Sequence, residues 1–245
     1  MTTSLHRGRA VLGTVLMSLA LPLMLLVALA LIPLGHRLSG RRRFGYEVGR
    51  RIMRVCWRLL GIRLEQVHRE RIEPSRPRVY MPNHESLLDM PQVMSVIPGT
   101  AGTLIKEEAF RVPLVGSAFR ACGFIPVNRK SPRAARRAFL SAVAEARAGR
   151  SFVVAPEGTR SRTGELGPFK TGGFRIAMEA RIPVVPITVE GAGALMRPGS
   201  WLIHPGVVRI TWNEPVETSH LDPKDRAQLA DLMRSVRQTM EAGKA

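Results

Sequence analysis

The chain has 245 residues, of which 45% are hydrophobic and 5% aromatic, and its 37 Lys and Arg against 19 Asp and Glu give a formal net charge of +18. This hydrophobic share supports one substantial core and excludes a disordered chain, and two cysteines far apart exclude a disulfide framework. The charge favours anionic lipid headgroups or phosphorylated metabolites over nucleic acid, because no RNP-like or zinc-finger spacing accompanies it.

The first element is an apolar segment, since residues 10–35 contain no charged side chain. Roughly 20 apolar residues cross a bilayer as a helix, and Pro22 would kink that helix, so a bent span or a re-entrant hairpin is expected. A secretory signal peptide and a buried core helix are the alternatives. The arginines that follow predict that the rest of the chain lies on the cytoplasmic side of the cell membrane.

A helix is expected next, with arginines on several sides and an apolar stripe of Phe44, Val48, Ile52, Val55 and Leu59. This pattern is typical of an interfacial helix on a membrane and equally of a soluble helix that covers a core. Residues 1–61 are therefore interpreted as a membrane anchor with a basic interfacial helix, and residues 62–245 as one catalytic α/β domain.

Short apolar runs alternate with helical segments after residue 61. Ser131 is expected to cap one helix, with Pro132 in its first turn, and Asp222 is expected to cap the last helix. This alternation predicts an α/β fold with a mostly parallel central sheet flanked by helices. The expected strands are residues 78–81, 102–105, 123–127, 152–155, 184–189 and 207–212.

The most informative stretch is residues 82–89, in which His84 stands five positions before Asp89. Positions i and i+5 lie about 140° apart on an ideal helix, so the two side chains can meet only if His84 lies in a loop and Asp89 near a helix start. A carboxylate fixes the tautomer of an imidazole and leaves the other ring nitrogen free to take a proton. The pair therefore predicts a general base at the end of a strand.

Other interpretations of this stretch stay open. His84 could be a surface histidine and Asp89 a helix cap. Ser86 could be a hydrolase nucleophile, although it lacks a GxSxG elbow. Glu85 is the only local candidate for a third metal ligand, so no metal site is expected.

A second polar stretch, residues 156–162, follows an expected strand. Gly158 permits close backbone approach, Thr159 can donate a hydroxyl hydrogen bond, and Arg160 can clamp a phosphate. Glu157 could bind a substrate hydroxyl or hold an arginine. The loop is interpreted as an anion-binding site, and a plain turn with solvated arginines is the alternative.

These stretches carry a family resemblance. Asn83-His84 with Asp89 is similar to the NHxxxxD block of the glycerolipid acyltransferase superfamily, and of the 1-acylglycerol-3-phosphate (lysophosphatidic acid) acyltransferases in particular. Three further blocks at residues 123–129, 156–161 and 182–187 follow in that family's order. The chain departs from the usual pattern at Ala155, where phenylalanine is common, and at Asn128, where an acidic residue is common. These departures leave the acyl-chain and headgroup preference open.

The resemblance implies roles for individual residues. His84 is expected to be the catalytic base and Asp89 its partner. Glu157, Gly158 and Arg160 are expected to bind the glycerophosphate together with Thr159, and Arg129 and Lys106 are expected to help.

The resemblance also implies the reaction. A fatty acyl group would move from an acyl-CoA or acyl carrier protein thioester to the free hydroxyl of 1-acylglycerol 3-phosphate, giving phosphatidic acid for phospholipid biosynthesis. No cofactor is expected beyond this co-substrate, and the expected partners are an anionic lysophospholipid, the acyl donor and the bilayer. The alternatives are acyl transfer to another lysolipid, such as a lyso-aminolipid or a remodelled phospholipid, a non-enzymatic basic membrane-surface protein, and a lipid hydrolase using Ser86.

Overall fold

The computed structural model describes residue 8, residues 11–15, residue 26, and residues 41–161, 163–196, 200 and 202–244. Most of the apolar segment at 10–35, which is predicted to associate with the membrane, lies outside these described residues. Arg162 of the predicted anion-binding loop lies outside them as well. Within the described part of the chain, no helix combines the length and apolarity needed to cross a bilayer.

A seven-stranded sheet forms the centre of the fold. Its strands are β1 (Ile62–Val67), β2 (Val79–Pro82), β3 (Ala101–Lys106), β4 (Ile125–Val127), β5 (Ser151–Val153), β6 (Val184–Glu190) and β7 (Gly206–Trp212). They lie in the order β1-β7-β6-β2-β5-β3-β4, and all neighbours are parallel except β6 and β7. The mostly parallel sheet of an α/β fold is therefore confirmed.

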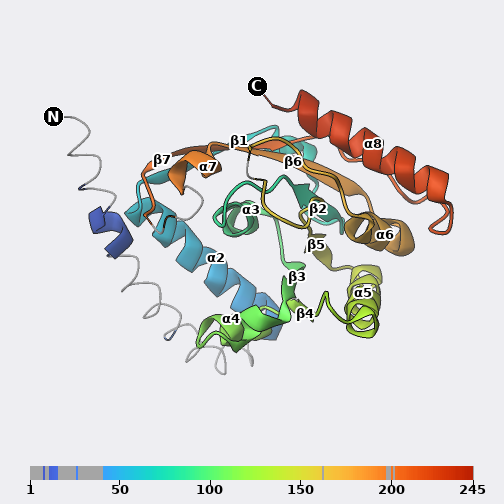
Figure 1. The fold of residues 1–245 in the computed structure, drawn as a ribbon, viewed down its shortest axis with the longest axis horizontal. Helices are drawn as coiled ribbons and strands as arrows, with labels where there is room; N and C mark the ends of the chain where they lie inside the picture. Colours follow the sequence, from blue (N-terminus) through green and yellow to red (C-terminus); the bar gives the residue numbers. More distant parts are fainter. Residues whose placement is uncertain are drawn as a thin grey trace.

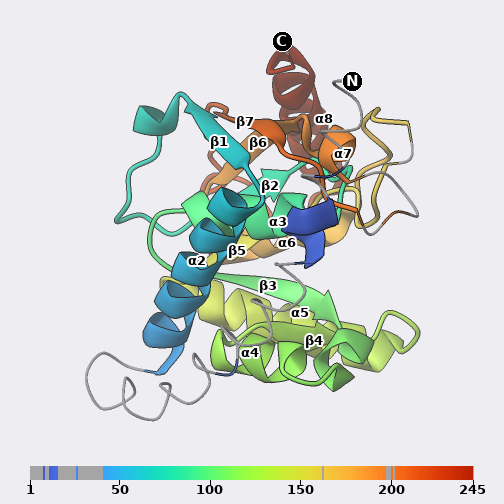
Figure 2. The ribbon, with the colours of Figure 1, turned by 90° about the vertical axis from the view of Figure 1, so that its left-hand side faces the viewer.

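Helices cover both faces of this sheet (Figures 1 and 2). The helices are α2 (Arg41–Leu59), α3 (Asp89–Val96), α4 (Val115–Ala121), α5 (Pro132–Arg147), α6 (Thr171–Ala180), α7 (Ala192–Leu195) and α8 (Arg226–Ala242), with short 3-10 turns η1 (Arg69–Arg71) and η2 (Glu107–Arg111). Side chains of β2 alternate between the two faces: Tyr80 packs with the core under α2 and α3, whereas Val79 and Met81 pack with the core under α5, α6 and α8.

The apolar face of α2 differs from the expected stripe. Tyr46 and Trp57 are buried and bond to α3, through the Tyr46 hydroxyl to the Met94 carbonyl (3.0 Å) and through Trp57 Nε1 to the Ser95 hydroxyl (3.3 Å). Val55 and Leu59, by contrast, are 42% and 51% exposed, so the expected apolar stripe is buried only in part. The rings of Tyr46 and Trp57 bury more area and also satisfy their polar tips, so they decide which face turns inward.

Of the two predicted helix caps, the cap of α5 is confirmed and the cap of α8 is wrong. The Ser131 hydroxyl accepts a hydrogen bond from the Ala134 amide (3.3 Å), as expected of a cap on α5. α8 begins later than expected, because Asp225 accepts from the amides of Ala227 (2.8 Å) and Gln228 (3.2 Å). Asp222 instead accepts from the Lys224 amide (2.9 Å) and closes a turn before the helix.

Candidate active site

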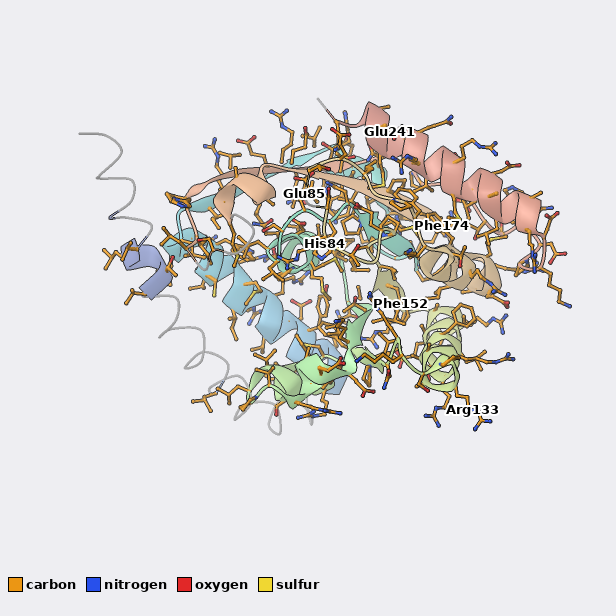
Figure 3. The ribbon with its side chains drawn as sticks, viewed as in Figure 1. His84, Glu85, Arg133, Phe152, Phe174 and Glu241 are labelled. Atoms are coloured by element: carbon orange, nitrogen blue, oxygen red, sulfur yellow. The ribbon has the colours of Figure 1, made fainter. Side chains whose placement is uncertain are left out.

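The candidate site lies where β2 and β5 end, at the carboxyl edge of the parallel part of the sheet. The chain leaves β2 through the loop at 83–88 and enters α3 at Asp89. β5 leads into the loop at 154–170, which returns to α6. Figure 3 shows His84 near the middle of the molecule, in contrast to the outward-pointing Arg133 of α5. Open α/β sheets place their ligands at this edge.

Asn83 fastens the first loop to β6. Its side-chain oxygen accepts from the Val189 amide (2.6 Å) and its side-chain nitrogen donates to the Val189 carbonyl (2.9 Å). The side chain therefore takes the place of a neighbouring peptide group just beyond the end of β2. Asn83 belongs to a motif recognisable in the sequence, but the motif does not predict that its side chain binds the backbone of β6.

His84 and Asp89 meet across the loop-to-helix junction, as the spacing requires. The Nδ1 atom of His84 lies 3.1 Å from Oδ2 of Asp89. The same Oδ2 accepts from the amides of Glu85 (2.6 Å) and Ser86 (2.7 Å), and Asp89 is fully buried at the start of α3. Because Oδ2 is an acceptor toward both amides, it faces Nδ1 as an acceptor too, so Nδ1 carries the proton between them and Nε2 is the open position of the neutral ring.

Glu157 holds the backbone of His84 in place. It is 3% exposed, its Oε1 accepts from the His84 amide (3.0 Å), and its Oε2 accepts from the Gly167 amide (2.9 Å). The His84 carbonyl accepts in turn from the Ser161 amide (2.6 Å). Both carboxylate oxygens thus accept hydrogen bonds from backbone amides inside the protein, which places Glu157 as a support of the histidine, and its contact with substrate stays a prediction.

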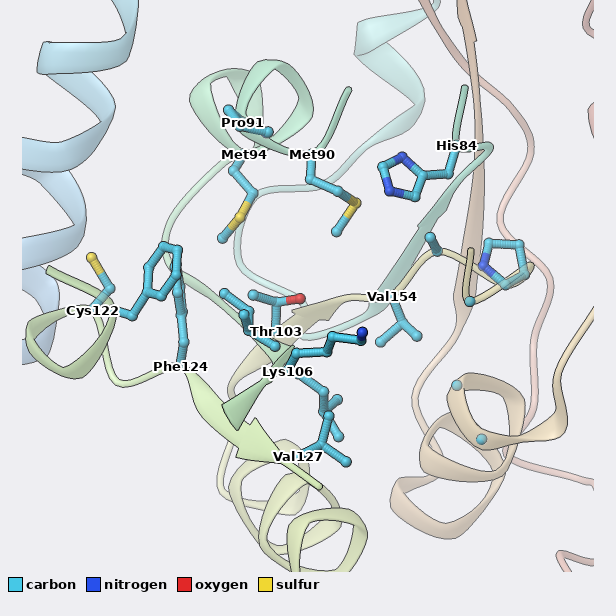
Figure 4. A pocket seen from close by; sticks show the side chains of 18 of the residues that line it. His84, Met90, Pro91, Met94, Thr103, Lys106, Cys122, Phe124, Val127 and Val154 are labelled. Atoms are coloured by element: carbon cyan, nitrogen blue, oxygen red, sulfur yellow. The ribbon is translucent and has the colours of Figure 1, made fainter. Parts of the chain in front are cut away.

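A cavity of about 910 Å³ opens beside His84. Figure 4 shows His84 at one end, Cys122 and Phe124 at the opposite end, and Met90 and Met94 between them. The volume is within the range of ligand sites, and the lining is mostly apolar. An apolar cavity with a single imidazole at one end suits a long apolar substrate that reacts at its polar end.

Cationic and polar groups gather near the His84 end of the cavity. Lys106, Arg129, Gly158 and Thr159, all predicted as substrate-binding residues, line it, and so does Lys170. Gly158 has φ +69°, a conformation that favours glycine, and its carbonyl accepts from Arg129 Nη1 (2.8 Å). Lys170 immediately precedes α6 and is not among the predicted substrate-binding residues.

Arg160 differs from the other predicted substrate-binding residues. Its side chain is exposed and lies outside the lining of the cavity. The structure therefore brings His84, Lys106, Arg129, Gly158 and Thr159 to one cavity, with Asp89 buried behind His84, and it leaves Arg160 at the surface of the same loop.

The side chains that could serve as nucleophiles are not activated. Ser86 is buried outside the cavity lining, and its hydroxyl accepts from the Leu88 amide (3.3 Å). Cys122 lines the cavity, but burial raises the pKa of its thiol to about 11, so it is protonated at neutral pH. Among the described residues no group of three or more His, Cys, Asp or Glu side chains could hold a metal ion.

Residues 63–190, more than half of the chain, match the family model described as Acyltransferase. The chain is 36% identical over 165 residues to a chloroplast 1-acyl-sn-glycerol-3-phosphate acyltransferase of Brassica napus, a match that covers 65% of this chain and 47% of that protein. It thus spans about half the length of this plant relative. A mouse 1-acyl-sn-glycerol-3-phosphate acyltransferase alpha is 30% identical, with 86% of this chain and 74% of that protein covered.

A solved structure of similar fold is the 1-acyl-sn-glycerophosphate acyltransferase PlsC of Thermotoga maritima. The two folds superpose with a TM-score of 0.82 over 98% of each chain at 24% sequence identity. This likeness bears on the fold alone.

The contacts of Asn83 lead to a stability prediction. Asn83→Ala removes both hydrogen bonds to the buried Val189 peptide and should lower the free energy of unfolding by about 2 kcal/mol or more, since an unsatisfied buried polar group costs about 1–3 kcal/mol. Asn128→Ala is the matched control, because the Asn128 side chain accepts from the amide of the exposed Lys130 (2.9 Å), where water can replace the bond. Denaturant unfolding measures both variants, and an equal loss of stability in the two would contradict the role of Asn83.

Proposed function

The chain belongs to the acyltransferase family, and from this premise we propose that it transfers a fatty acyl group from a thioester to the free hydroxyl of 1-acylglycerol 3-phosphate, giving phosphatidic acid. The observation that carries the proposal is the position of His84. Its ring is held through Nδ1 by Asp89 and lies at the end of a long apolar cavity. The names of the relatives support the choice of acceptor.

The reaction proceeds by direct transfer between the two substrates. Nε2 of His84 takes the proton from the acceptor hydroxyl as its oxygen attacks the thioester carbonyl carbon. Asp89 stabilises the imidazolium that forms. When the carbon–sulfur bond breaks, the leaving thiolate takes the proton back from Nε2, and the histidine returns to its neutral state. The buried Ser86 and the protonated Cys122 support a path without an acyl-enzyme.

The apolar cavity accommodates the acyl chain of the donor. The thioester carbonyl must reach His84, so the rest of the chain extends away from it between Met90 and Met94, toward Phe124 and Cys122. Burial of this methylene chain contributes roughly 0.8 kcal/mol for each CH₂ group. The donor's carrier, coenzyme A or acyl carrier protein, then remains at the open side of the site.

The cations around the His84 end bind phosphate. Lys106, Arg129 and Lys170 line the cavity there, and Thr159 adds a hydroxyl donor. Charged hydrogen bonds of this kind hold the phosphate of the acceptor and keep its free hydroxyl near Nε2. Arg160, exposed on the same loop, extends this cationic region toward solvent.

We also propose that the protein works at the cytoplasmic face of a membrane, where both the acceptor and its product reside. The uncharged run at residues 10–35 supports this location, as do the arginines after it. The exposed Val55 and Leu59 on α2 lie beside the exposed Arg51, Arg54 and Arg58, a combination that suits an anionic lipid surface.

A thiol-release assay tests the proposed function. The parent protein, with a panel of lyso-acceptors and with acyl-CoA or acyl carrier protein as donor, should release thiol in the presence of 1-acylglycerol 3-phosphate. His84→Ala should lower turnover by about 10²–10⁴-fold, the contribution of a positioned base. His220→Ala, which removes an exposed histidine, is the matched control and should leave turnover unchanged.

Each other outcome of this assay points to a different function. Turnover of His84→Ala within about tenfold of the parent contradicts the role of His84 as the base. Release of fatty acid without an acceptor indicates a hydrolase. Release of thiol only with a different lysolipid reassigns the acceptor, and salt-sensitive lipid binding without any turnover indicates a non-enzymatic surface protein.

The position of Cys122 gives a prediction about chain length. Cys122→Phe adds a ring at the end of the cavity remote from His84, so turnover with the longest acyl-CoA donors should fall while turnover with shorter donors is retained. Cys122→Ala removes only the thiol and should keep the parent's preference. An unchanged chain-length profile in Cys122→Phe would show that the acyl chain lies elsewhere.

A further inference from the structure

Arg237 lies on α8, outside the lining of the cavity, and it binds the loop that carries Glu157. Its Nη1 donates to the Gly167 carbonyl (2.9 Å) and its Nη2 donates to the Leu166 carbonyl (2.8 Å). The guanidinium carbon also lies over the ring of Phe169, 5.5 Å from its centre. One planar side chain thereby fixes two successive peptide groups, as a forked donor can and a lysine cannot.

These contacts lead directly to His84. The amide of Gly167 donates to Oε2 of Glu157 (2.9 Å), and Oε1 of Glu157 accepts from the His84 amide (3.0 Å). Only one peptide group and one carboxylate therefore separate Arg237 from the histidine backbone. A Cβ atom at Gly167 would lie 3.1 Å from Oε2, so the close approach of this peptide to Glu157 depends on glycine.

α8 is a fixed support for this chain of contacts. Leu232, Val236 and Met240 are buried in the core, which leaves the helix little freedom to shift. The ion pair between Arg237 and Glu241 (2.9 Å) adds to the placement of the guanidinium, and Figure 3 shows Glu241 on the same helix. A second cation from this end of the chain, Lys244, donates to the Gly164 carbonyl (2.8 Å).

Near Gly167 the loop is anchored by Leu166, which is buried in the core, and by Arg237. Its base is closed by the Lys170 amide donating to the Pro156 carbonyl (2.7 Å), but Thr163, Glu165 and Pro168 are exposed. The peptide that Glu157 depends on is therefore held from the outside by Arg237.

We propose that Arg237 is a positioning residue for His84. It holds the Leu166 and Gly167 carbonyls so that the Gly167 amide keeps Glu157 in place, and Glu157 in turn holds the backbone from which the His84 ring reaches the cavity. Its effect on turnover rests on the function proposed for His84, whereas its effect on the loop does not.

Amide hydrogen exchange, resolved to single residues, tests this proposal without any substrate. Arg237→Ala should speed exchange at the His84 and Gly167 amides by about tenfold, because a local opening of the loop becomes easier. The amides of Val79 and Val154, which are bonded within the sheet, should exchange as in the parent. Arg234→Ala is the matched control on α8, since Arg234 is exposed and pairs with the exposed Asp231 (3.0 Å).

Two results would overturn the proposal. One is unchanged exchange at His84 and Gly167 in Arg237→Ala, and the other is a uniform rise that includes Val79 and Val154, which indicates a general loss of stability. Arg237→Lys, which keeps the charge but cannot fork to two carbonyls, provides a milder variant should Arg237→Ala fold poorly. Arg237→Lys should also speed exchange selectively at the His84 and Gly167 amides, but by less than Arg237→Ala does. Unchanged exchange at both amides in this variant would equally overturn the proposal.

Measurements of kcat and KM test whether the loop affects catalysis. Arg237→Ala should lower kcat at least about fivefold with the donor KM within about twofold of the parent. In a Glu157→Gln background the further loss from Arg237→Ala should vanish, because both changes act through one chain of contacts, and additive losses would contradict this. If the parent protein transfers no acyl group, the proposed function is refuted. The amide-exchange result still decides whether Arg237 positions His84.

Discussion

The structure of the site depends on one buried oxygen, Oδ2 of Asp89. Three donors converge on it, namely the amides of Glu85 and Ser86 and Nδ1 of His84. The two amide bonds close the turn between β2 and α3, and the third bond orients the ring of His84. The fold of the loop and the protonation pattern of the base are therefore set by the same carboxylate, so the loop cannot change shape without disturbing the imidazole. Bonds from two backbone amides also compensate for the burial of the charge.

The other carboxylate of the site, Glu157, works in a similar way on the backbone of His84. It joins a loop that follows β2 to a loop that follows β5, and it does so because β2 and β5 are neighbours in the sheet. Neither carboxylate lines the cavity, which is bordered instead by the imidazole, by cations and by apolar side chains. The hydrogen bonds that both carboxylates accept inside the protein make this arrangement rigid. Rigid placement of a base is what a direct transfer between two bound substrates requires.

Much of the fold follows from local pattern in the sequence, and most of the exceptions involve tertiary contacts. Six strands are recognisable as apolar runs, whereas β1 is missed because Arg63 and Glu65 interrupt its apolar pattern. The pairing of His84 with Asp89 follows from helix geometry alone. The role of Glu157 does not, because its partners lie 73 residues before it and 10 residues after it. The separation of Arg160 from the cavity depends likewise on the path of the loop, which residue types and spacing do not determine.

The central claim is that Asp89 keeps the proton of the neutral His84 ring on Nδ1 and leaves Nε2 free to act as the base. Nitrogen-15 NMR of the histidine side chains, with His84 assigned through the His84→Ala variant, measures this directly at a pH where the ring is neutral. The account predicts a protonated Nδ1 and an unprotonated Nε2 for His84. A neutral ring that carries its proton on Nε2 would contradict it.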